Sequence, residues 1–274
     1  MRYFLKLSYD GTNYCGWQVQ RNAPSVQQTI NEALQKLLGH HISSCGCGRT
    51  DTGVHAKDFY MHFNAENEIA DLVDFLFRLN CVLPESITIS RIIPMPEKAH
   101  TRFDATQRTY EYYLYFDKSS FIKRFALYQG FYKIDWQKVI DGTEFIKTIE
   151  DFTSLCLPSE DFKTNICKIT DARWDVFPAH HYILKPFDEN VPGLPLVPPY
   201  QFNEGALLRF TISSNRFLRG MVRKTVGTLL MIGKGKVDPE EFKEIVSTKK
   251  DFRIHYLAPP NGLYLSNIKY PYFP

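Results

Sequence analysis

The sequence predicts an α+β fold, and three observations support that class. Alternating apolar and polar residues mark 3–9 as a half-buried strand, and an apolar stripe at helical spacing marks 25–38 as an amphipathic helix. Further segments continue the order strand, helix, strand, strand, helix, strand. A similar order partly repeats after the proline-rich stretch 94–97. This order is typical of ferredoxin-like units, in which helices cover one face of a sheet.

The first half of the chain carries clear helix-end signals. Ser25 occupies an N-cap position with Gln28 three residues later, which is a capping-box pattern, and Gly39 is expected to end the helix. The other elements expected in this half are strands over 42–47, 54–63 and 87–93, and a helix over 71–79 that ends before Pro84.

The second half is expected to be longer and less regular. It contains predicted strands over 107–116, 168–177, 206–212 and 263–269, and predicted helices over 136–149, over 216–232 and after Asp238. Residues 178–200 hold six of the sixteen prolines and are expected to have little regular structure. We therefore predict two domains, residues 1–98 and residues 99–274.

Composition permits several function classes and excludes few. With 274 residues and 44% hydrophobic content, the chain can bury a sizeable core. A formal net charge of +3 permits nucleic-acid binding but does not diagnose it. No apolar run could span a bilayer, and Lys6 and Asp10 interrupt any signal-peptide pattern. We expect a cytoplasmic protein without a membrane partner, whose six cysteines are reduced.

The stretch Gly48–Ala56 is the strongest functional candidate. It places Arg49, Asp51 and His55 among two glycines, in a loop that leads into the predicted strand 54–63. Loops supported by rigid elements often carry catalytic groups, although a polar turn in which Asp51 bonds its own backbone is the simpler interpretation.

The predicted helix 216–232 is the second candidate. Arg216, Arg219 and Arg223 would share one side of it, with Gly220 and Gly227 beside them. A solvated charged face is the usual fate of such a pattern. Each glycine in a helix interior costs about 1 kcal/mol, so we favour a surface that approaches a phosphate backbone or a cleft containing Asp51.

A metal site is a weaker possibility. Cys45 and Cys47 lie close to His40 and His41, but their spacing does not match zinc-binding patterns. We expect the cysteines to be small buried residues and predict no metal.

Several separated segments resemble, in order, the TruA family of tRNA pseudouridine synthases. The segments that carry this resemblance are 7–11 with 16–18, 25–27, the Gly-Arg-Thr-Asp-Thr-Gly-Val-His-Ala loop 48–56, Asn80–Pro84, 102–105 with 108–112, Asn215–Arg223 and Ala258–Leu265. Together they span nearly the whole chain.

The resemblance implies a pseudouridine synthase fold and a reaction. Two ferredoxin-like halves would share a mostly antiparallel sheet covered by helices, with a cleft between them. A homodimer would isomerise uridine to pseudouridine at positions 38, 39 and 40 in the anticodon stem-loop of tRNA. The family uses neither cofactor nor metal.

The resemblance also assigns roles to particular residues. Asp51 would be the catalytic carboxylate, acting as a nucleophile toward sugar or base, or as a base. Arg223 would pair with it. Tyr110 would stack on the uracil and relay a proton, and Arg49 would occupy the space left by the target nucleotide. The basic pattern of the predicted helix, and not the resemblance, makes Arg216 and Arg219 candidates for binding substrate.

Some positions depart from the family pattern, and three alternatives remain open. Thr52 replaces a common alanine, the pairs 219–220 and 224–225 differ in the late segment, and the proline-rich stretch is longer than usual. The alternatives are a pseudouridine synthase acting on other tRNA or RNA positions, a non-catalytic RNA-binding protein, and a metal-binding protein.

Overall fold

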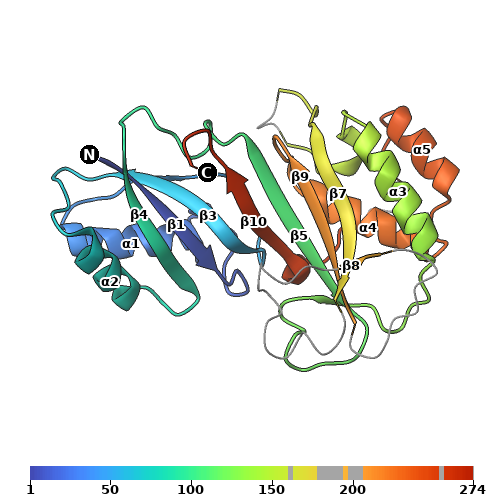
Figure 1. The fold of residues 1–274 in the computed structure, drawn as a ribbon, viewed down its shortest axis with the longest axis horizontal. Helices are drawn as coiled ribbons and strands as arrows, with labels where there is room; N and C mark the ends of the chain where they lie inside the picture. The colour runs from blue at the N-terminus through green and yellow to red at the C-terminus, as the bar shows by residue number, and fades with distance from the viewer. Residues whose placement is uncertain (160–162, 178–193, 197–205, 253–255, 274) are drawn as a thin grey trace. The chain divides into compact units, whose positions relative to one another are not determined.

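A computed structural model describes residues 1–159, 163–177, 194–196, 206–252 and 256–273 of the chain. Backbone contacts divide it into two compact units (Figure 1). Unit 1 comprises Met1–Arg108 with Tyr264–Pro274, and unit 2 comprises Thr109–Leu263. Both units combine strands with helices, which confirms the α+β class. The division into 1–98 and 99–274 stays a prediction about the two sequence halves. None of the described helices is long and apolar enough to cross a membrane.

Unit 1 contains five strands and two helices among its described residues. The strands hydrogen-bond in the order β4-β1-β3-β10, and β2 pairs with β3. Pairing is antiparallel for β1–β3, β1–β4 and β2–β3, and parallel for β3–β10. The elements are β1 (Arg2–Tyr9), α1 (Val26–Leu38), β2 (Ser44–Gly46), β3 (His55–Asn64), α2 (Leu72–Val82), β4 (Ile87–Met95) and β10 (Leu263–Lys269).

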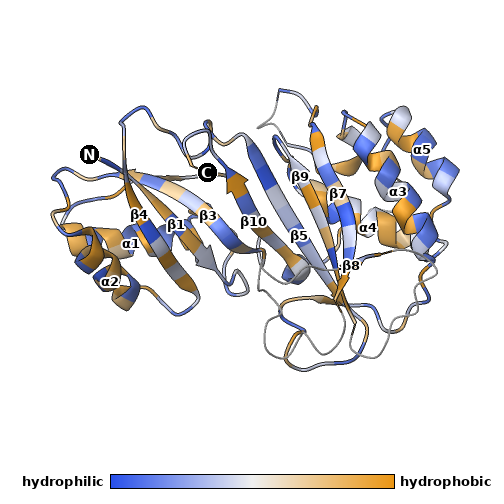
Figure 2. Ribbon diagram, in the orientation of Figure 1, coloured by the Kyte–Doolittle hydropathy of each residue, from blue (hydrophilic) through white to orange (hydrophobic). Residues whose placement is uncertain are grey.

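Local sequence chemistry explains where the helices of unit 1 begin and end. Ser25 caps α1 by accepting a hydrogen bond from the Gln28 backbone N–H, and Gly39 ends the helix in the left-handed conformation, as predicted. The Gln28 side-chain amide donates to the Glu32 carboxylate at 2.9 Å. Asp71 caps α2 by accepting from two backbone N–H groups. Both helices carry hydrophobic residues along their length (Figure 2), of which Ile30, Leu34, Phe75 and Leu79 are buried.

Unit 2 holds the remaining elements. Its strands run in the order β5-β9-β7-β8, and β6 pairs with β5 in parallel. The elements are β5 (Gln107–Tyr115), β6 (Leu127–Tyr128), α3 (Trp136–Thr148), η1 (Thr153–Leu155), β7 (Ile169–Phe177), β8 (Leu194–Pro195), β9 (Leu207–Ser214), α4 (Met221–Gly233), α5 (Pro239–Ser247) and η3 (Pro260–Gly262). Asp238 caps α5 and Pro239 is its first residue, as predicted. Of the proline-rich stretch 178–200, only 194–196 lies within the described residues.

The predicted start of the helix at residue 216 was wrong. The helix α4 starts at Met221, because Gly220 takes a φ of 64° and forms the N-cap in the left-handed conformation. Arg216 and Arg219 therefore lie in the loop before the helix, and the three arginines do not share a helical face. Only Arg223 belongs to α4.

The second glycine argument also needs correction. Gly227 does lie inside α4, but a Cβ there would stand 2.0 Å from the Tyr256 carbonyl oxygen. The close approach that this glycine permits is therefore to the chain's own backbone. Nearly every residue of α4 is buried, which makes it a core helix of unit 2.

Candidate active site

Asp51 lies in the loop between β2 and β3 and is half-buried. The loop turns immediately after it, because the Val54 N–H donates to the Asp51 carbonyl oxygen over 3.1 Å. Gly53 takes a φ of 75° within that turn, a conformation that disfavours side chains. The backbone of the turn thus fixes the position from which the Asp51 carboxylate projects.

A second segment, residues 9–17, holds the loop from outside. The Tyr9 hydroxyl hydrogen-bonds the Thr50 hydroxyl at 2.9 Å, and both side chains are buried. The Trp17 N–H donates to the Thr50 carbonyl oxygen at 3.2 Å. On the other side of Asp51, the Gly53 N–H donates to the Tyr14 carbonyl oxygen. The residues flanking Asp51 are therefore fixed on both sides.

Two glycines make this close approach possible. A Cβ at Gly11 would stand 2.0 Å from the Val54 carbonyl oxygen, and one at Gly16 would stand 2.4 Å from that of Thr50. Gly16 also has a φ of 85°. Neither position can carry a side chain unless the loop moves. Sequence reasoning identified Gly11 and Gly16 as part of a family-like segment but did not assign them this role.

His55 joins the same two segments. It opens β3, is fully buried, and stacks on Tyr264 with ring centroids 4.7 Å apart. Its Nδ1 lies 3.1 Å from an Asp10 carboxylate oxygen and 3.1 Å from the Gly11 backbone nitrogen. When protonated, Nδ1 donates to the Asp10 carboxylate, and when unprotonated, it accepts from the Gly11 N–H. In either tautomer His55 therefore connects β3 to the turn at residues 10–11.

Arg49 is presented differently from Asp51. Arg49 is exposed, whereas Asp51 is half-buried. At the neighbouring Gly48, no atom lies within 4 Å of the position that a Cβ would take. Open space on this side of the loop is compatible with the approach of a large substrate.

In unit 2, Arg223 and the segment that begins at Ala258 hold each other. The Arg223 Nε donates to the Ala258 carbonyl oxygen at 2.7 Å, and the Ala258 N–H donates to the Arg223 carbonyl oxygen at 3.1 Å. This reciprocal pair brings together two of the family-like segments, 215–223 and 258–265. It also fixes the orientation of the half-buried guanidinium, which lies in the first turn of α4.

The other predicted residues of unit 2 lie on β5 and before α4. Tyr110 is the fourth residue of β5, is 8% exposed, and meets Phe217 edge to face at 4.9 Å. Arg219 is exposed, and its carbonyl oxygen accepts from the Leu157 N–H. Arg216 is half-buried, and its N–H donates to the Ser214 hydroxyl at 3.4 Å.

One group of three possible metal ligands lies together within the described residues: Cys45, His62 and His100. It differs from the cysteine and histidine combination that the sequence suggested. The His100 Nδ1 accepts from the backbone N–H groups of Arg102 and Phe103 at 3.1 and 3.3 Å. The ring proton of neutral His100 therefore sits on Nε2, 3.9 Å from the Cys45 sulfur. A metal on Nε2 would displace that proton, so this geometry favours a hydrogen-bonded cluster.

The electrostatics of the cluster agree with that interpretation. Burial, together with the nearby charge of Arg2, lowers the pKa of His62 to about 4. Burial raises the pKa of the Cys45 thiol above its ordinary value, although Arg102 and other arginines oppose this. The histidine is neutral at pH 7, and the surrounding arginines repel cations.

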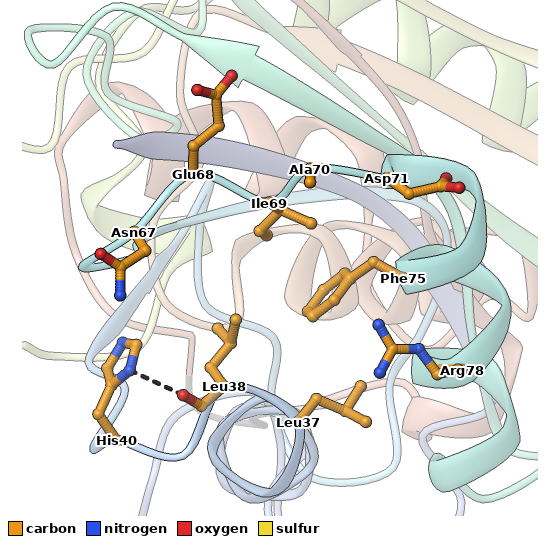
Figure 3. A pocket seen from close by; sticks show the side chains of 10 residues that line it. All are labelled: Leu37, Leu38, His40, Asn67, Glu68, Ile69, Ala70, Asp71, Phe75 and Arg78. Atoms are coloured by element: carbon orange, nitrogen blue, oxygen red, sulfur yellow. Dashed lines mark hydrogen bonds between the residues drawn. The ribbon is translucent and has the colours of Figure 1, made fainter.

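A cavity of about 320 Å³ lies elsewhere in unit 1, between the end of α1 and the start of α2 (Figure 3). None of the predicted site residues lines it. Two of its charged groups have structural roles, because Asp71 caps α2 and Arg78 pairs with Asp74, and the third, Glu68, is exposed. We therefore place the candidate site at the Asp51 loop.

Comparison with known proteins shows the family of the chain. A family model described as tRNA pseudouridine synthase matches residues 149–271. The tRNA pseudouridine synthase A of Porphyromonas gingivalis is 37% identical over 271 residues, which are 98% of this chain and 97% of the relative. Those of Azobacteroides pseudotrichonymphae and Bacteroides fragilis are each 36% identical over 270 residues, 98% of this chain and 97% and 96% of the relatives. Because this similarity extends over almost the full length of each protein, the chain belongs to the TruA family of tRNA pseudouridine synthases.

Proposed function

We propose that this protein isomerises uridine to pseudouridine at positions 38, 39 and 40 in the anticodon stem-loop of tRNA, with Asp51 as the catalytic carboxylate. The observation that supports this most is the way the Asp51 loop is built. The residues on both sides of Asp51 are fixed by hydrogen bonds to residues 9–17. Preorganised groups of this kind are typical of catalytic sites.

The reaction requires cleavage of the bond between uracil N1 and C1′, rotation of the base, and formation of a C5–C1′ bond. A carboxylate serves this sequence as a nucleophile or as a base. In the proposal, Arg223 pairs with Asp51 through a bidentate contact. The bond from its Nε to the Ala258 carbonyl oxygen supports this role, because it fixes the plane of the guanidinium.

The remaining predicted residues act on the RNA. Tyr110 stacks on the target uracil and relays a proton, and its edge contact with Phe217 would keep the ring in one orientation. Arg49 enters the space that the target nucleotide vacates. Arg216 and Arg219 bind phosphates from the loop before α4. The proposed enzyme is a cytoplasmic homodimer that uses neither cofactor nor metal.

The test is to incubate purified protein with unmodified tRNAs and to map pseudouridine position by position. Formation at 38, 39 or 40 by the wild type, with none by Asp51→Asn, is the expected result. Asp74→Asn is the matched control, because Asp74 is exposed on α2, where it pairs with Arg78. Pseudouridine at other positions would redirect the proposal to a different substrate. Tight tRNA binding without any isomerisation would indicate a non-catalytic RNA-binding protein.

A further inference from the structure

The segment between β5 and α3, residues 117–133, has an unusual charge for its length. It contains four basic residues against one aspartate, and therefore holds a formal net charge of +3, as large as that of the whole chain. The basic residues are Lys118, Lys123, Arg124 and Lys133, and all four are exposed. We call residues 117–133 the basic aromatic loop.

Large rings stand in solvent on the same segment. Phe121 is 89% exposed, Phe131 is 82% exposed and Tyr132 is 55% exposed. Figure 2 shows hydrophobic and hydrophilic residues interspersed along this loop. Exposed rings next to cations are the combination with which proteins bind single-stranded nucleic acid, because bases stack on the rings while the cations contact phosphates.

The loop is held in a defined conformation. The Asn261 side-chain amide donates to the carbonyl oxygens of Lys123 and Ala126, each at 2.9 Å. β6, within the loop, pairs with β5, and a Cβ at Gly130 would stand 2.0 Å from the Phe116 carbonyl oxygen. Several independent contacts thus fix the base of the loop while its rings remain uncovered.

A further cation lies beside the neighbouring rings of Phe131 and Tyr132. Lys234, at the end of α4, places its Nζ 3.6 Å from the centre of the Tyr132 ring. Phe131 is supported from within the loop, because Tyr128 meets it edge to face at 5.0 Å. The two neighbouring rings are therefore oriented by their surroundings and are adjacent to positive charge.

We propose that the basic aromatic loop is a second RNA-contact surface, on which Phe121 and Phe131 stack on bases outside the reacting uridine while the lysines contact phosphates. This inference rests on the proposed function, since it takes tRNA as the partner. Tyr110 lies on β5, which ends at Tyr115, and the loop begins seven residues after Tyr110, so at about 3.3 Å per extended residue it begins roughly 23 Å from Tyr110. It would contact nucleotides several positions away from the one that is isomerised.

A second copy of the chain fits this surface less well. A twofold interface brings the same patch of each copy together, so a net charge of +3 would face an equal charge. A polyanion suits the loop, because each phosphate contact neutralises a lysine and releases counterions.

The test compares tRNA affinity of the wild type with that of two variants, Phe121→Ala/Phe131→Ala and Lys118→Ala/Lys123→Ala, over a series of salt concentrations. Loss of stacking should weaken binding about fivefold or more. Loss of the two lysines should lower the slope of log affinity against log salt by about 0.7 to 0.9 per phosphate contact. The rate of conversion of bound tRNA should stay unchanged. Phe77→Ala and Lys36→Ala, an exposed ring and an exposed lysine of unit 1, are the matched controls.

The outcomes separate this inference from the proposed function. If the wild type isomerises tRNA but both loop variants keep its affinity and salt slope, the loop is not an RNA contact. A change in oligomeric state on light scattering, with tRNA affinity per protomer retained, would identify a self-association surface and overturn the inference. A wild type that neither binds nor isomerises tRNA would overturn both proposals. Circular dichroism and the single variants Phe121→Ala and Lys123→Ala show whether any loss reflects folding.

Discussion

The Asp51 loop and the start of α4 both carry a charged residue of the candidate site, but they are held in place differently. Around Asp51, the supporting contacts are made by its neighbours: Thr50 and Gly53 are bonded to residues 9–17. At the start of α4, Arg223 is itself a support, because its Nε bonds the Ala258 carbonyl oxygen. The loop around Asp51 is held by the hydrogen bonds of its neighbours. The Arg223 side chain, in contrast, makes a hydrogen bond that fixes its own position.

This difference predicts how each residue responds to substitution. Replacing Asp51 removes a functional group and leaves in place the hydrogen bonds by which Thr50 and Gly53 are held to residues 9–17. Replacing Arg223 removes a functional group together with a hydrogen bond to a backbone carbonyl. Activity and stability should therefore separate cleanly at Asp51 and should be coupled at Arg223.

The largest expected effect is that of Asp51→Asn. Turnover should fall about a thousandfold or more, as it does when a catalytic nucleophile is removed. The melting temperature and the tRNA dissociation constant should stay close to those of the wild type. Single-turnover kinetics and thermal unfolding measure the two properties. Substantial isomerisation by the pure variant would remove Asp51 from the mechanism.

Arg223→Ala should come next, with turnover of bound tRNA reduced about a hundredfold. It should also lower the free energy of unfolding by about 1 to 3 kcal/mol, because the Ala258 carbonyl oxygen loses its donor. Arg223→Lys should rescue poorly, since an ammonium group cannot reproduce the planar fork. Arg219→Ala provides the contrast, because this exposed residue should affect affinity rather than turnover. An Arg223→Ala protein that binds tRNA weakly but converts it at the normal rate would make Arg223 another phosphate contact.

Gly16→Ala should have a smaller effect that acts through the loop. Its φ of 85° and the 2.4 Å approach to the Thr50 carbonyl oxygen leave no room for a methyl group. We expect a loss of about 1 to 3 kcal/mol in stability and about tenfold in turnover. Gly48→Ala is the control within the family motif itself, because nothing lies within 4 Å of its would-be Cβ. Equal effects of the two substitutions would show that the contacts of residues 9–17 do not position Asp51.

The same comparison shows what sequence can and cannot predict. The caps Ser25, Gly39 and Asp238 were predicted correctly, because a cap depends on residue types within a few positions. The beginning of α4 was not, because Arg216 and Arg219 match helical spacing by count while Gly220 breaks the helix through its backbone conformation. A count of helical spacing takes no account of the backbone φ angle at each residue, so it cannot detect where a left-handed glycine ends or begins a helix.

The contacts that hold the Asp51 loop were missed for a different reason. Tyr9 and Thr50 are 41 positions apart, so no local pattern links them. The available signal was the presence of glycines at 11 and 16 next to an aromatic segment, which could have suggested a close backbone approach. The hydrogen bonds between Arg223 and Ala258 could not be predicted from the sequence either, although both residues lie in segments that resemble the family.

A modest effect of pH is expected at His62, outside the candidate site. Burial lowers its pKa to about 4 in the folded protein, compared with about 6.5 in the unfolded chain. As pH falls below 6.5, the unfolded state takes up a proton that the folded state does not, so stability is lost until about pH 4. Thermal unfolding between pH 7 and 4 should therefore show a steeper loss for the wild type than for His62→Asn. Parallel curves would mean that the histidine titrates alike in both states.

Treatment with a metal chelator is expected to have no effect. The Thr101 backbone N–H donates to the His62 Nδ1 at 3.3 Å, and the Thr101 hydroxyl lies 2.8 Å from the same nitrogen, so this atom is already engaged within the protein. The Nε2 of His100 carries a proton, and the pKa of the Cys45 thiol is raised. Zinc takes three or four deprotonated ligands, which this cluster does not offer as it stands. Dialysis against a strong chelator should therefore leave both isomerisation and the melting temperature unchanged, and Cys45→Ser should behave likewise. Activity that disappears on dialysis and returns with zinc, but does not return in Cys45→Ser, would show that the hydrogen bonds of this cluster rearrange around a bound ion.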